Sequence, residues 1–479
     1  MNRRLVAAFV GRALQLEFFI LILPIAVSLF YGEDASSFLI TMVFLAVIGF
    51  PLSSLEVKNK NLRTRDGFAA VALTWIAISL FGALPFYFSG YITSLTDSFF
   101  EAVSGFTTTG ATILAAPELL PKGLLFWRAL TQFIGGMGIL VFMMTMTSSS
   151  ASSVNLLKAE STGPTPSKLV PKIRETARIL YIIYFGLSAV LLLLLICCGL
   201  APFDAILTTM CTAGTGGFAA HSLGIGVYGS LVAEIIVSIF MFLFGINFTL
   251  YFYLLRRNFK EFHQDEELRL YVGLAGVAIV LIARDIYPLC GSISEALRLS
   301  SFQVSGVIST AGYATANYSE WPVLSKTILM LLTLGGSSAG STGGGLKLIR
   351  VLIIGKSIRL EIDRLLHPRL VRTVRLQGRN VPEATVNGAL MFLCVYALCF
   401  AFFCLVMALE GNDLQTVVTS TLAIISNVGP GLGSAGPLGT FAAFSPLAKI
   451  TLSFGMFVSR LEFYPMLLLF TPGLWRNRI

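Results

Sequence analysis

Four short stretches of the 479-residue chain combine hydroxyl side chains with a glycine, and each lies between strongly apolar segments. Backbone carbonyls and threonine hydroxyls are oxygen ligands that can replace the hydration shell of a monovalent cation in a selectivity filter. Glycine allows the backbone conformations that such a loop needs and keeps side-chain bulk off the ion path. The stretches are Phe106–Thr112, Cys211–Ala219, Ser309–Ala314 and Ser426–Gly431.

None of these stretches contains Asp or Glu, whereas a calcium or sodium filter is expected to carry a ring of carboxylates. We therefore expect a site for a desolvated monovalent cation, with K⁺ the first choice. Four glycine turns that only cap helices are the alternative interpretation. The candidate ion-binding residues are Thr108, Thr109, Gly110, Thr215, Gly216, Gly217, Thr310, Ala311, Gly312, Asn427, Val428 and Gly429.

The spacing of the stretches indicates an internal repeat. Gly110, Gly217, Gly312 and Gly429 follow one another at intervals of 107, 95 and 117 residues, and similar periods of this kind determine the architecture. Each copy reads as a spanning helix, a half-length apolar segment, the glycine loop and a return helix. A segment of about 10–14 residues is too short to span a membrane and fits a re-entrant pore helix. Irregular backbone at that depth is tolerated only where it is buried in protein or lines water.

The composition places these repeats in a membrane. Hydrophobic residues make up 55% of the chain and charged residues only 12%, against about 25% charged in soluble domains. The apolar runs are long and continuous, which favours helices over a β-barrel. We predict an all-α polytopic protein with ten spans and four re-entrant pore helices around a central pore. The predicted units are two N-terminal transmembrane helices in residues 1–66 and four pore repeats in 67–176, 177–266, 267–382 and 383–479.

Return helices are predicted at about Leu124–Thr147 in the first copy, Val227–Leu255 in the second and Phe441–Phe470 in the fourth. The third begins near Ser325. Asn247 interrupts the second return helix and is a candidate pore-lining polar group.

The net charge of +9 collects at the two ends and in linkers near residues 158–174, 256–260 and 356–379. The positive-inside rule places these segments, and both termini, in the cytoplasm, so the charge does not indicate nucleic-acid binding. Seven Cys without metal-ligand spacing and three scattered His argue against a metal centre, and no nucleophile motif supports an enzyme. No covalently bound cofactor is expected.

A second glycine-rich stretch interrupts the third return helix. Six glycines in the eleven residues 335–345 cannot propagate a helix, because each costs about 1 kcal/mol relative to Ala. A phosphate-binding loop is the competing interpretation, but the G-x-x-x-x-G-K-[ST] pattern is absent and Lys347 is expected on the membrane side of a helix. We predict a barrier below the ion site, the gating loop. Its candidate residues are Gly335, Gly336, Ser337, Gly340, Ser341, Gly343, Gly344 and Gly345.

Ionisable residues within the spans are costly in a membrane and are usually functional. Arg460 lies deep in the last predicted span, where we expect it to limit conduction or to lock the gate. A purely structural pairing with Glu462 or with the gating loop is the alternative. Acidic residues near the starts of the pore helices are expected to cap them and to make the outer mouth negative. These residues are Asp97, Glu101, Asp204, Glu295 and Asp413.

The glycine loops and the gating loop resemble those of the Trk/Ktr/HKT superfamily of potassium transporters, over almost the whole chain. The two additional N-terminal spans make the chain more similar to the bacterial Trk membrane subunit than to KtrB. In this family a glycine in each loop accompanies K⁺ selectivity, and a serine in the first loop accompanies Na⁺ transport in some plant members. The fourth loop departs from the pattern, since Asn427 replaces the leading Thr and Pro430 follows the glycine.

The resemblance implies potassium uptake across the bacterial cytoplasmic membrane, with the gating loop and Arg460 as the gate. It also implies a homodimer and a cytosolic TrkA-like ring that binds the regulatory nucleotide, so that no nucleotide is expected on this chain. Uptake coupled to Na⁺ or H⁺, as suggested for KtrB-like relatives, remains the main alternative to a passive pore. A membrane-embedded enzyme is a more distant one.

Overall fold

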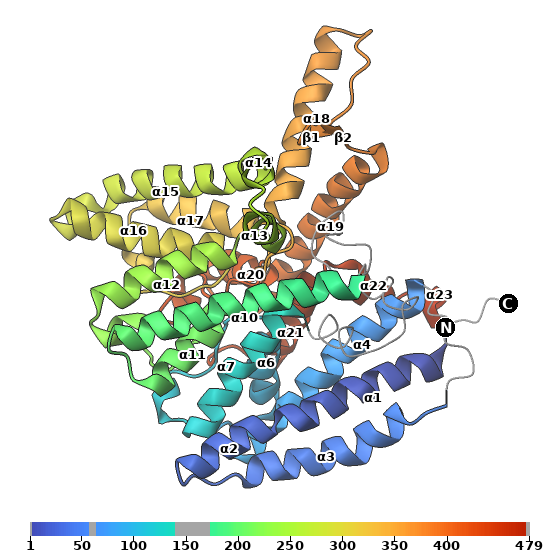
Figure 1. Cartoon of the computed structure of the whole chain (residues 1–479), viewed down its shortest axis with the longest axis vertical. Coiled ribbons are helices and arrows are strands. Elements are labelled where there is room, and N and C mark those ends of the chain that lie inside the picture. The colour runs from blue at the N-terminus through green and yellow to red at the C-terminus, as the bar shows by residue number, and fades with distance from the viewer. Residues whose placement is uncertain (1, 57–63, 139–172, 476–479) are drawn as a thin grey trace.

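The computed structural model describes residues 2–56, 64–138 and 173–475, and these residues are mostly helical (Figure 1). The described strands form one hairpin, in which β1 (Arg375–Leu376) pairs antiparallel with β2 (Arg379–Asn380). This hairpin and α18 (Leu348–Leu366) project from the body of the molecule. The prediction of a helical protein is confirmed for the described part of the chain.

The N-terminal segments form a helical layer against the first glycine-loop unit. α1 (Arg3–Ile20) continues after Leu21 as α2 (Ile22–Phe30), and α3 (Ser36–Ser53) runs beside α1. A Cβ added at Gly11 would lie 2.4 Å from the backbone nitrogen of Ser53. Glycine therefore lets α1 and α3 approach closely, as small residues do between membrane helices.

Four successive segments share one order of elements: a long helix, a short helix, a glycine loop and a return helix. The short helices are α6 (Leu95–Phe106), α11 (Pro202–Ala213), α16 (Ile293–Ile308) and α20 (Leu414–Ile425). The long helices before them are α4 (Thr64–Gly82) with α5 (Leu84–Phe88), α10 (Ile173–Cys197), α15 (Glu266–Cys290) and α19 (Glu383–Ala408). After each loop comes one short 3-10 turn, at Pro117–Leu119, Gly224–Tyr228, Tyr318–Glu320 and Gly433–Ala435.

The return helices are more broken than predicted. They are α7 (Lys122–Met137), α12 (Leu231–Phe244) with α13 (Phe248–Leu255), α17 (Val323–Gly335) with α18, and α21 (Pro446–Arg460) with α22 (Tyr464–Leu469). Short helices α14 (Phe259–Gln264) and α23 (Pro472–Trp475) complete the chain. The predicted continuation of α7 to Thr147, and most of the basic linker at 158–174, lie outside the described residues.

Two of the breaks in the return helices are visible in the local backbone geometry. α12 and α13 meet at 95°, and Asn247 caps α13 by accepting a hydrogen bond from the Thr249 amide at 2.9 Å. The single helix predicted over Phe441–Phe470 is wrong, because Glu462 and Phe463 adopt φ of +54° and +66° after Arg460. Left-handed residues of this kind end a right-handed helix.

Six described helical stretches are long and apolar enough to cross a membrane, and the bent pair α12–α13 makes a seventh if it counts as one span. The short helices that precede the glycine loops are not among these stretches, since α6, α11 and α20 have 12 residues each and α16 has 16. At about 1.5 Å per residue they cover roughly 18–24 Å, less than the hydrocarbon core of a bilayer.

Aromatic packing fixes the first short helix against its neighbours. Phe106, at the end of α6, meets Trp127 of α7 edge to face, with ring centroids 6.0 Å apart. The indole nitrogen of Trp127 donates to the Gly82 carbonyl at the end of α4, at 3.0 Å. Both aromatic residues are almost fully buried. The start of the first glycine loop is therefore held by packing on two other helices.

Candidate ion-binding site

The four glycine loops share one unusual backbone conformation. Their leading residues, three Thr and one Asn, have φ between +52° and +62°, a region that β-branched residues rarely adopt. Two residues later each loop has a glycine with φ between +70° and +93°. The fourth loop thus has the backbone of the others, and its departure lies in the side chain. The pairs are Thr108 with Gly110, Thr215 with Gly217, Thr310 with Gly312 and Asn427 with Gly429.

The loops contact one another in a closed ring. An ideal Cβ on Gly110 would lie 2.0 Å from the carbonyl oxygen of Gly216, in the next loop. The same relation holds around the circle, at 1.9 Å from Gly217 to Ala311, 1.9 Å from Gly312 to Val428 and 2.6 Å from Gly429 to Thr109. No real side chain tolerates such a separation from a backbone oxygen. Glycine is therefore required at all four positions, and four carbonyls, one from each loop, lie at one level.

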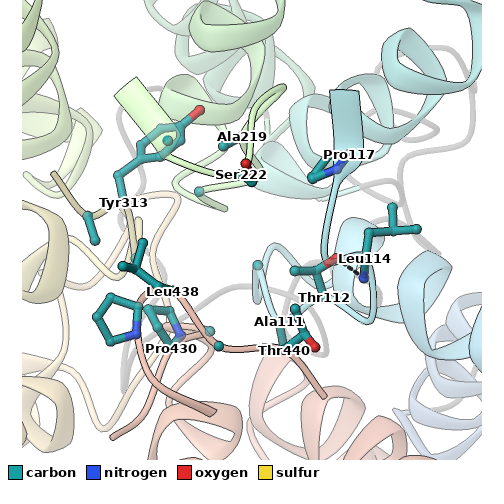
Figure 2. Close-up of a pocket in the computed structure, with 18 of the residues that line it drawn as sticks. Ala111, Thr112, Leu114, Pro117, Ala219, Ser222, Tyr313, Pro430, Leu438 and Thr440 are labelled. Carbon is teal, nitrogen blue, oxygen red and sulfur yellow. Dashed lines mark hydrogen bonds between the residues drawn. The ribbon is translucent and has the colours of Figure 1, made fainter. Parts of the chain in front are cut away.

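A pocket of about 100 Å³ opens on this ring. All four glycines of the ring line it, together with residues that follow them in each loop. Figure 2 shows Thr112, Ala219, Tyr313 and Pro430 around the opening, each from a different loop. Four of the twelve candidate ion-binding residues, the ring glycines, are thus brought together around one cavity, although they lie up to about 320 residues apart in the sequence.

The prediction of a negative outer mouth is not supported at the pocket itself, since no Asp or Glu is among the residues that line it. Asp97 accepts a hydrogen bond from Lys449 at 2.7 Å, and Glu295 lies 3.7 Å from Arg298. Together with Glu101, which pairs with Arg128, three of the five acidic groups are therefore paired with Lys or Arg. Only Asp413 is the N-cap of its helix, whereas Ser94 and Ser292 cap α6 and α16.

The sequence predicts Glu101 at the outer mouth of the pore, and this prediction is wrong. It lies one turn beyond Asp97 on α6, is fully buried, and forms an ion pair with Arg128 of α7 at 2.6 Å. Its carboxylate also accepts hydrogen bonds from the Thr112 hydroxyl and the Ile113 amide. Arg128 in turn donates to the Ala219 carbonyl at 2.8 Å. This buried pair joins the first and second loops at the wall of the pocket, which Arg128 lines.

Below the ring, the leading side chains face the gating loop. The Thr215 hydroxyl donates to Thr342 at 3.2 Å, and the Gly344 amide donates to the Thr310 hydroxyl at 2.8 Å. Asn427 instead donates to the Thr109 hydroxyl at 2.7 Å. Thr108 accepts from Arg460 at 3.2 Å. Every repeat thus has a hydrogen bond at this level, but the partners differ.

The gating loop occupies residues 336–347, between α17 and α18, slightly longer than predicted. Ser337 and Gly343 to Gly345 lie within it, as does Ser341, which donates to Ser337 at 2.9 Å. Its backbone bonds to the broken return helix of the second unit, from Ser338 to the Gly245 carbonyl and from Phe248 to the Gly340 carbonyl, both at 3.1 Å. Gly335 is the last residue of α17. At Gly336, φ is +69° and a Cβ would lie 2.6 Å from the Gly344 carbonyl, so the two arms of the loop touch.

Arg460 links the gating loop to the first unit. Its guanidinium donates to the Thr342 carbonyl at 2.8 Å, to the Thr108 hydroxyl at 3.2 Å and to the Gly136 carbonyl at 2.9 Å, and it also contacts the Gly135 carbonyl. The side chain is buried. One charge therefore holds the first glycine loop, the end of α7 and the gating loop together, and Asn247 stands beside Gly340 of the same loop.

Three residues of this region were missed or misplaced from the sequence. Lys347 is not on a membrane-facing helix surface: it is buried in the gating loop with φ +72°, and its amine contacts Ser337 and Gly343. Glu267, near the start of α15, accepts from the Ala339 amide in the gating loop at 2.7 Å and from the Ile349 amide just after the loop at 3.0 Å. Gln132 of α7 contacts the second glycine loop. A polar residue in an apolar helix is the only sequence signal for Gln132.

Comparison with known proteins places the chain in a family. Residues 35–476 match the TrkH family model, described as a cation transport protein. The chain is 36% identical to the Trk system potassium uptake protein TrkH of Salmonella typhimurium over the full length of both, and 32% identical to TrkG of Escherichia coli over 95% of each. The crystal structure of the potassium transporter TrkH from Vibrio parahaemolyticus aligns with a TM-score of 0.89 at 31% identity, over 99% of this chain and 100% of that one. The chain therefore belongs to the TrkH family of cation transport proteins, and it is a membrane transporter rather than an enzyme.

Proposed function

We propose that this chain takes up K⁺ across the bacterial cytoplasmic membrane through one pore, as the membrane subunit of a Trk system. The observation that carries the proposal is the closed ring in which each loop glycine faces a carbonyl of the next loop. A ring of carbonyls without carboxylates suits a desolvated monovalent cation. The names of the relatives, which are potassium uptake proteins, support K⁺ as that cation.

The filter of this pore consists of the twelve residues predicted from the four glycine loops. Carbonyl oxygens of Thr109, Gly216, Ala311 and Val428 form one ligand layer, and the leading side chains form the next layer toward the cytoplasm. The C-terminal ends of α6, α11, α16 and α20 precede the loops and direct partial negative charge toward the ion.

The gate consists of the gating loop and Arg460. The loop fills the space below the filter and bonds to Thr215 and Thr310, and Arg460 bonds to Thr108. This arrangement is a closed state, and conduction requires the loop to leave these contacts. The chain then comprises the two N-terminal helices (1–66) and four pore repeats (67–176, 177–266, 267–382 and 383–479), with ten spans and both termini in the cytoplasm.

A TrkA-like cytosolic ring opens this gate, and two copies of the chain form a homodimer. The projecting α18 and the segment 367–374 that follows it support a protein partner on the cytoplasmic side, because they combine arginines with strongly exposed apolar side chains. Leu365 is 82% exposed and Val371 96% exposed. Apolar groups in such a position indicate an interaction surface. The nucleotide belongs to the partner.

Proton-coupled uptake is a second candidate, and Glu17 of α1 is the observation in its favour. This carboxyl is buried, and neither of its oxygens has a hydrogen-bond partner within the described residues. A carboxyl in that setting is a possible proton carrier. Proton flux that follows the K⁺ gradient in the wild type and disappears in Glu17→Gln would establish coupling. K⁺ flux without proton flux in the wild type would instead support the passive pore.

Ion flux in proteoliposomes tests the filter. In Gly110→Ser the new Cβ would meet the Gly216 carbonyl at 2.0 Å, so we expect the ratio of K⁺ to Na⁺ flux to fall by about tenfold or more, a change of only about 1.4 kcal/mol. Gly90→Ser is the matched control, because Gly90 has φ +76° but no atom within 4 Å of the added Cβ. An unchanged ratio in Gly110→Ser would refute the filter assignment.

A further inference from the structure

Gln132 reaches from the return helix of the first unit into the loop of the second. Its amide nitrogen donates to the Gly216 carbonyl at 2.8 Å, and its amide oxygen accepts from the Phe218 backbone N–H at 3.1 Å. The side chain is fully buried. The amide of Gln132 therefore holds the peptides on both sides of Gly217, one of the four glycines in the ring.

The carbonyl that Gln132 binds is a ring carbonyl. Of the four, only the Gly216 oxygen accepts a hydrogen bond within the described residues, and those of Thr109, Ala311 and Val428 accept none there. A carbonyl oxygen has two lone pairs, so it can accept from Gln132 and still bind an ion. The ring thus has one carbonyl that is oriented and polarised by a side chain, and three that are not.

The second loop also has the greatest need for such a support. It places Gly216 directly before the ring glycine, where the other loops have Thr109, Ala311 and Val428. Two successive glycines leave the peptide between them unusually free to rotate. A Cβ at position 216 would lie 2.4 Å from the Gln132 amide carbon, so the glycine that loosens the loop also makes room for the clamp.

The next peptide is held from the third unit. The Tyr313 hydroxyl donates to the Phe218 carbonyl at 3.0 Å, and the Arg128 guanidinium lies 3.5 Å from the centre of the Phe218 ring. Phe218 is therefore already fixed by its carbonyl and its ring. Gln132 provides the remaining restraint, because its hydrogen bond orients the Gly216 carbonyl toward the ion path.

We propose that Gln132 is a selectivity-determining positioning residue, which holds the Gly216 carbonyl in the geometry and at the field strength that favour K⁺. This inference rests on the proposed filter. Selectivity in a carbonyl ring depends on the number, the placement and the dipole strength of its ligands. Without the amide donor the peptide between Gly216 and Gly217 can turn its oxygen away, which leaves a ring of three carbonyls that discriminates less against Na⁺.

The test is the K⁺ to Na⁺ permeability ratio of the full-length protein in proteoliposomes, for the wild type and Gln132→Met. Methionine matches glutamine in length but cannot donate to the carbonyl, so we expect the ratio to fall about fivefold, the effect of losing one ordinary hydrogen bond. Gln415→Met, at an exposed position in α20, is the matched control and should keep the wild-type ratio. A wild-type ratio in Gln132→Met overturns the inference, because a residue that only packs would change the amount of active protein and not the ratio.

Two further measurements keep the outcome interpretable. Gly110→Ser is assayed beside Gln132→Met: if neither changes the ratio the filter itself is wrong, and if only Gly110→Ser changes it the filter stands and the role of Gln132 fails. If Gln132→Met conducts no ions, the unfolding temperature in detergent is measured with KCl and with NaCl. Bound ion stabilises the folded state, so we expect the extra stabilisation by K⁺ over Na⁺ to shrink in Gln132→Met, and an undiminished difference overturns the inference.

Discussion

At the scale of single residues, the contacts of Arg460 allow the proposed gate to be tested against a simple structural support. The guanidinium bonds to Thr342 in the gating loop and to Thr108 in the first glycine loop. It also places a positive charge beside the proposed ion path. If Arg460 belongs to the gate as proposed, both effects oppose conduction, and a variant without the charge should conduct better even though it loses packing.

We predict that Arg460→Ala raises K⁺ flux in proteoliposomes. Each charge-assisted hydrogen bond is worth about 1.5–3 kcal/mol, so losing even one that holds the closed loop corresponds to roughly tenfold or more. Arg460→Lys serves as the comparison, because it keeps the charge but cannot form the same set of hydrogen bonds. Its K⁺ flux should lie between that of the wild type and that of Arg460→Ala. Unchanged or lower flux in a folded Arg460→Ala protein would show that Arg460 does not restrain the gate.

The sequence predicted the glycines of the ring well and their supporting residues poorly. Gly110 and its three counterparts stand out because glycine and hydroxyl residues are unusual inside an apolar segment. Gln132 and Glu101 each contact a loop through a side chain on a helix, so only the fold reveals the contact. The misplacement of Glu101 has a simple cause: a residue one turn beyond the start of a short helix is already buried.

At the scale of elements, the gating loop is held from outside by Glu267. One oxygen of this carboxylate accepts from Ala339 within the loop and from Ile349 just after it. Neighbouring Glu266 contacts Lys356 of α18 and accepts from the Gln377 amide of the hairpin segment. The start of α15 therefore connects the projecting hairpin to the gating loop.

We predict that Glu267→Ala loosens the loop, because two backbone amides lose their acceptor together. Hydrogen exchange at residues 336–347 should become faster and K⁺ flux should rise, with Glu267→Gln intermediate since the neutral amide oxygen still accepts. The control is Glu361→Ala, an exposed position on α18. Exchange as slow as in the wild type would mean that Glu267 does not hold the loop.

The helix breaks show what a hydropathy pattern can and cannot predict. The glycine-rich break after α17 was visible, because six glycines are incompatible with a helix. The break after Arg460 was not, because nothing in the types of Glu462 and Phe463 signals the left-handed conformations that they adopt. Glu462 forms an ion pair with Arg350 of α18, a contact between distant residues that the local sequence does not reveal.

At the scale of the whole molecule, four unequal units form one ring. The matching left-handed residues show that the backbone repeats closely, whereas the side chains behind it do not. Glu101 with Arg128 supports the first two loops, Gln132 supports the second, and Tyr313 reaches from the third. A single chain can tune each quarter of a pore separately, which an assembly of four identical subunits cannot.

The segment between α18 and β1, residues 367–374, gives a prediction at this scale. Val371→Asp places a charge on the most exposed apolar side chain of that segment. We expect it to weaken binding of a TrkA-like ring by about tenfold, roughly 1.4 kcal/mol, in a pull-down or by calorimetry, while the K⁺ to Na⁺ flux ratio stays as in the wild type. Leu231→Asp, at an apolar site remote from the hairpin, is the control. If both variants bind the TrkA-like ring equally well, the ring binds another surface of the chain.

The central claim is that one monovalent cation binds between the carbonyls of Thr109, Gly216, Ala311 and Val428. Anomalous diffraction from crystals grown with Rb⁺ in place of K⁺ tests this claim most directly. We predict an anomalous peak on the axis of the ring, in contact with all four carbonyl oxygens, and its loss from Gly110→Ser crystals grown in the same way. A wild-type ring without a peak, in crystals that show Rb⁺ bound elsewhere, would contradict the account.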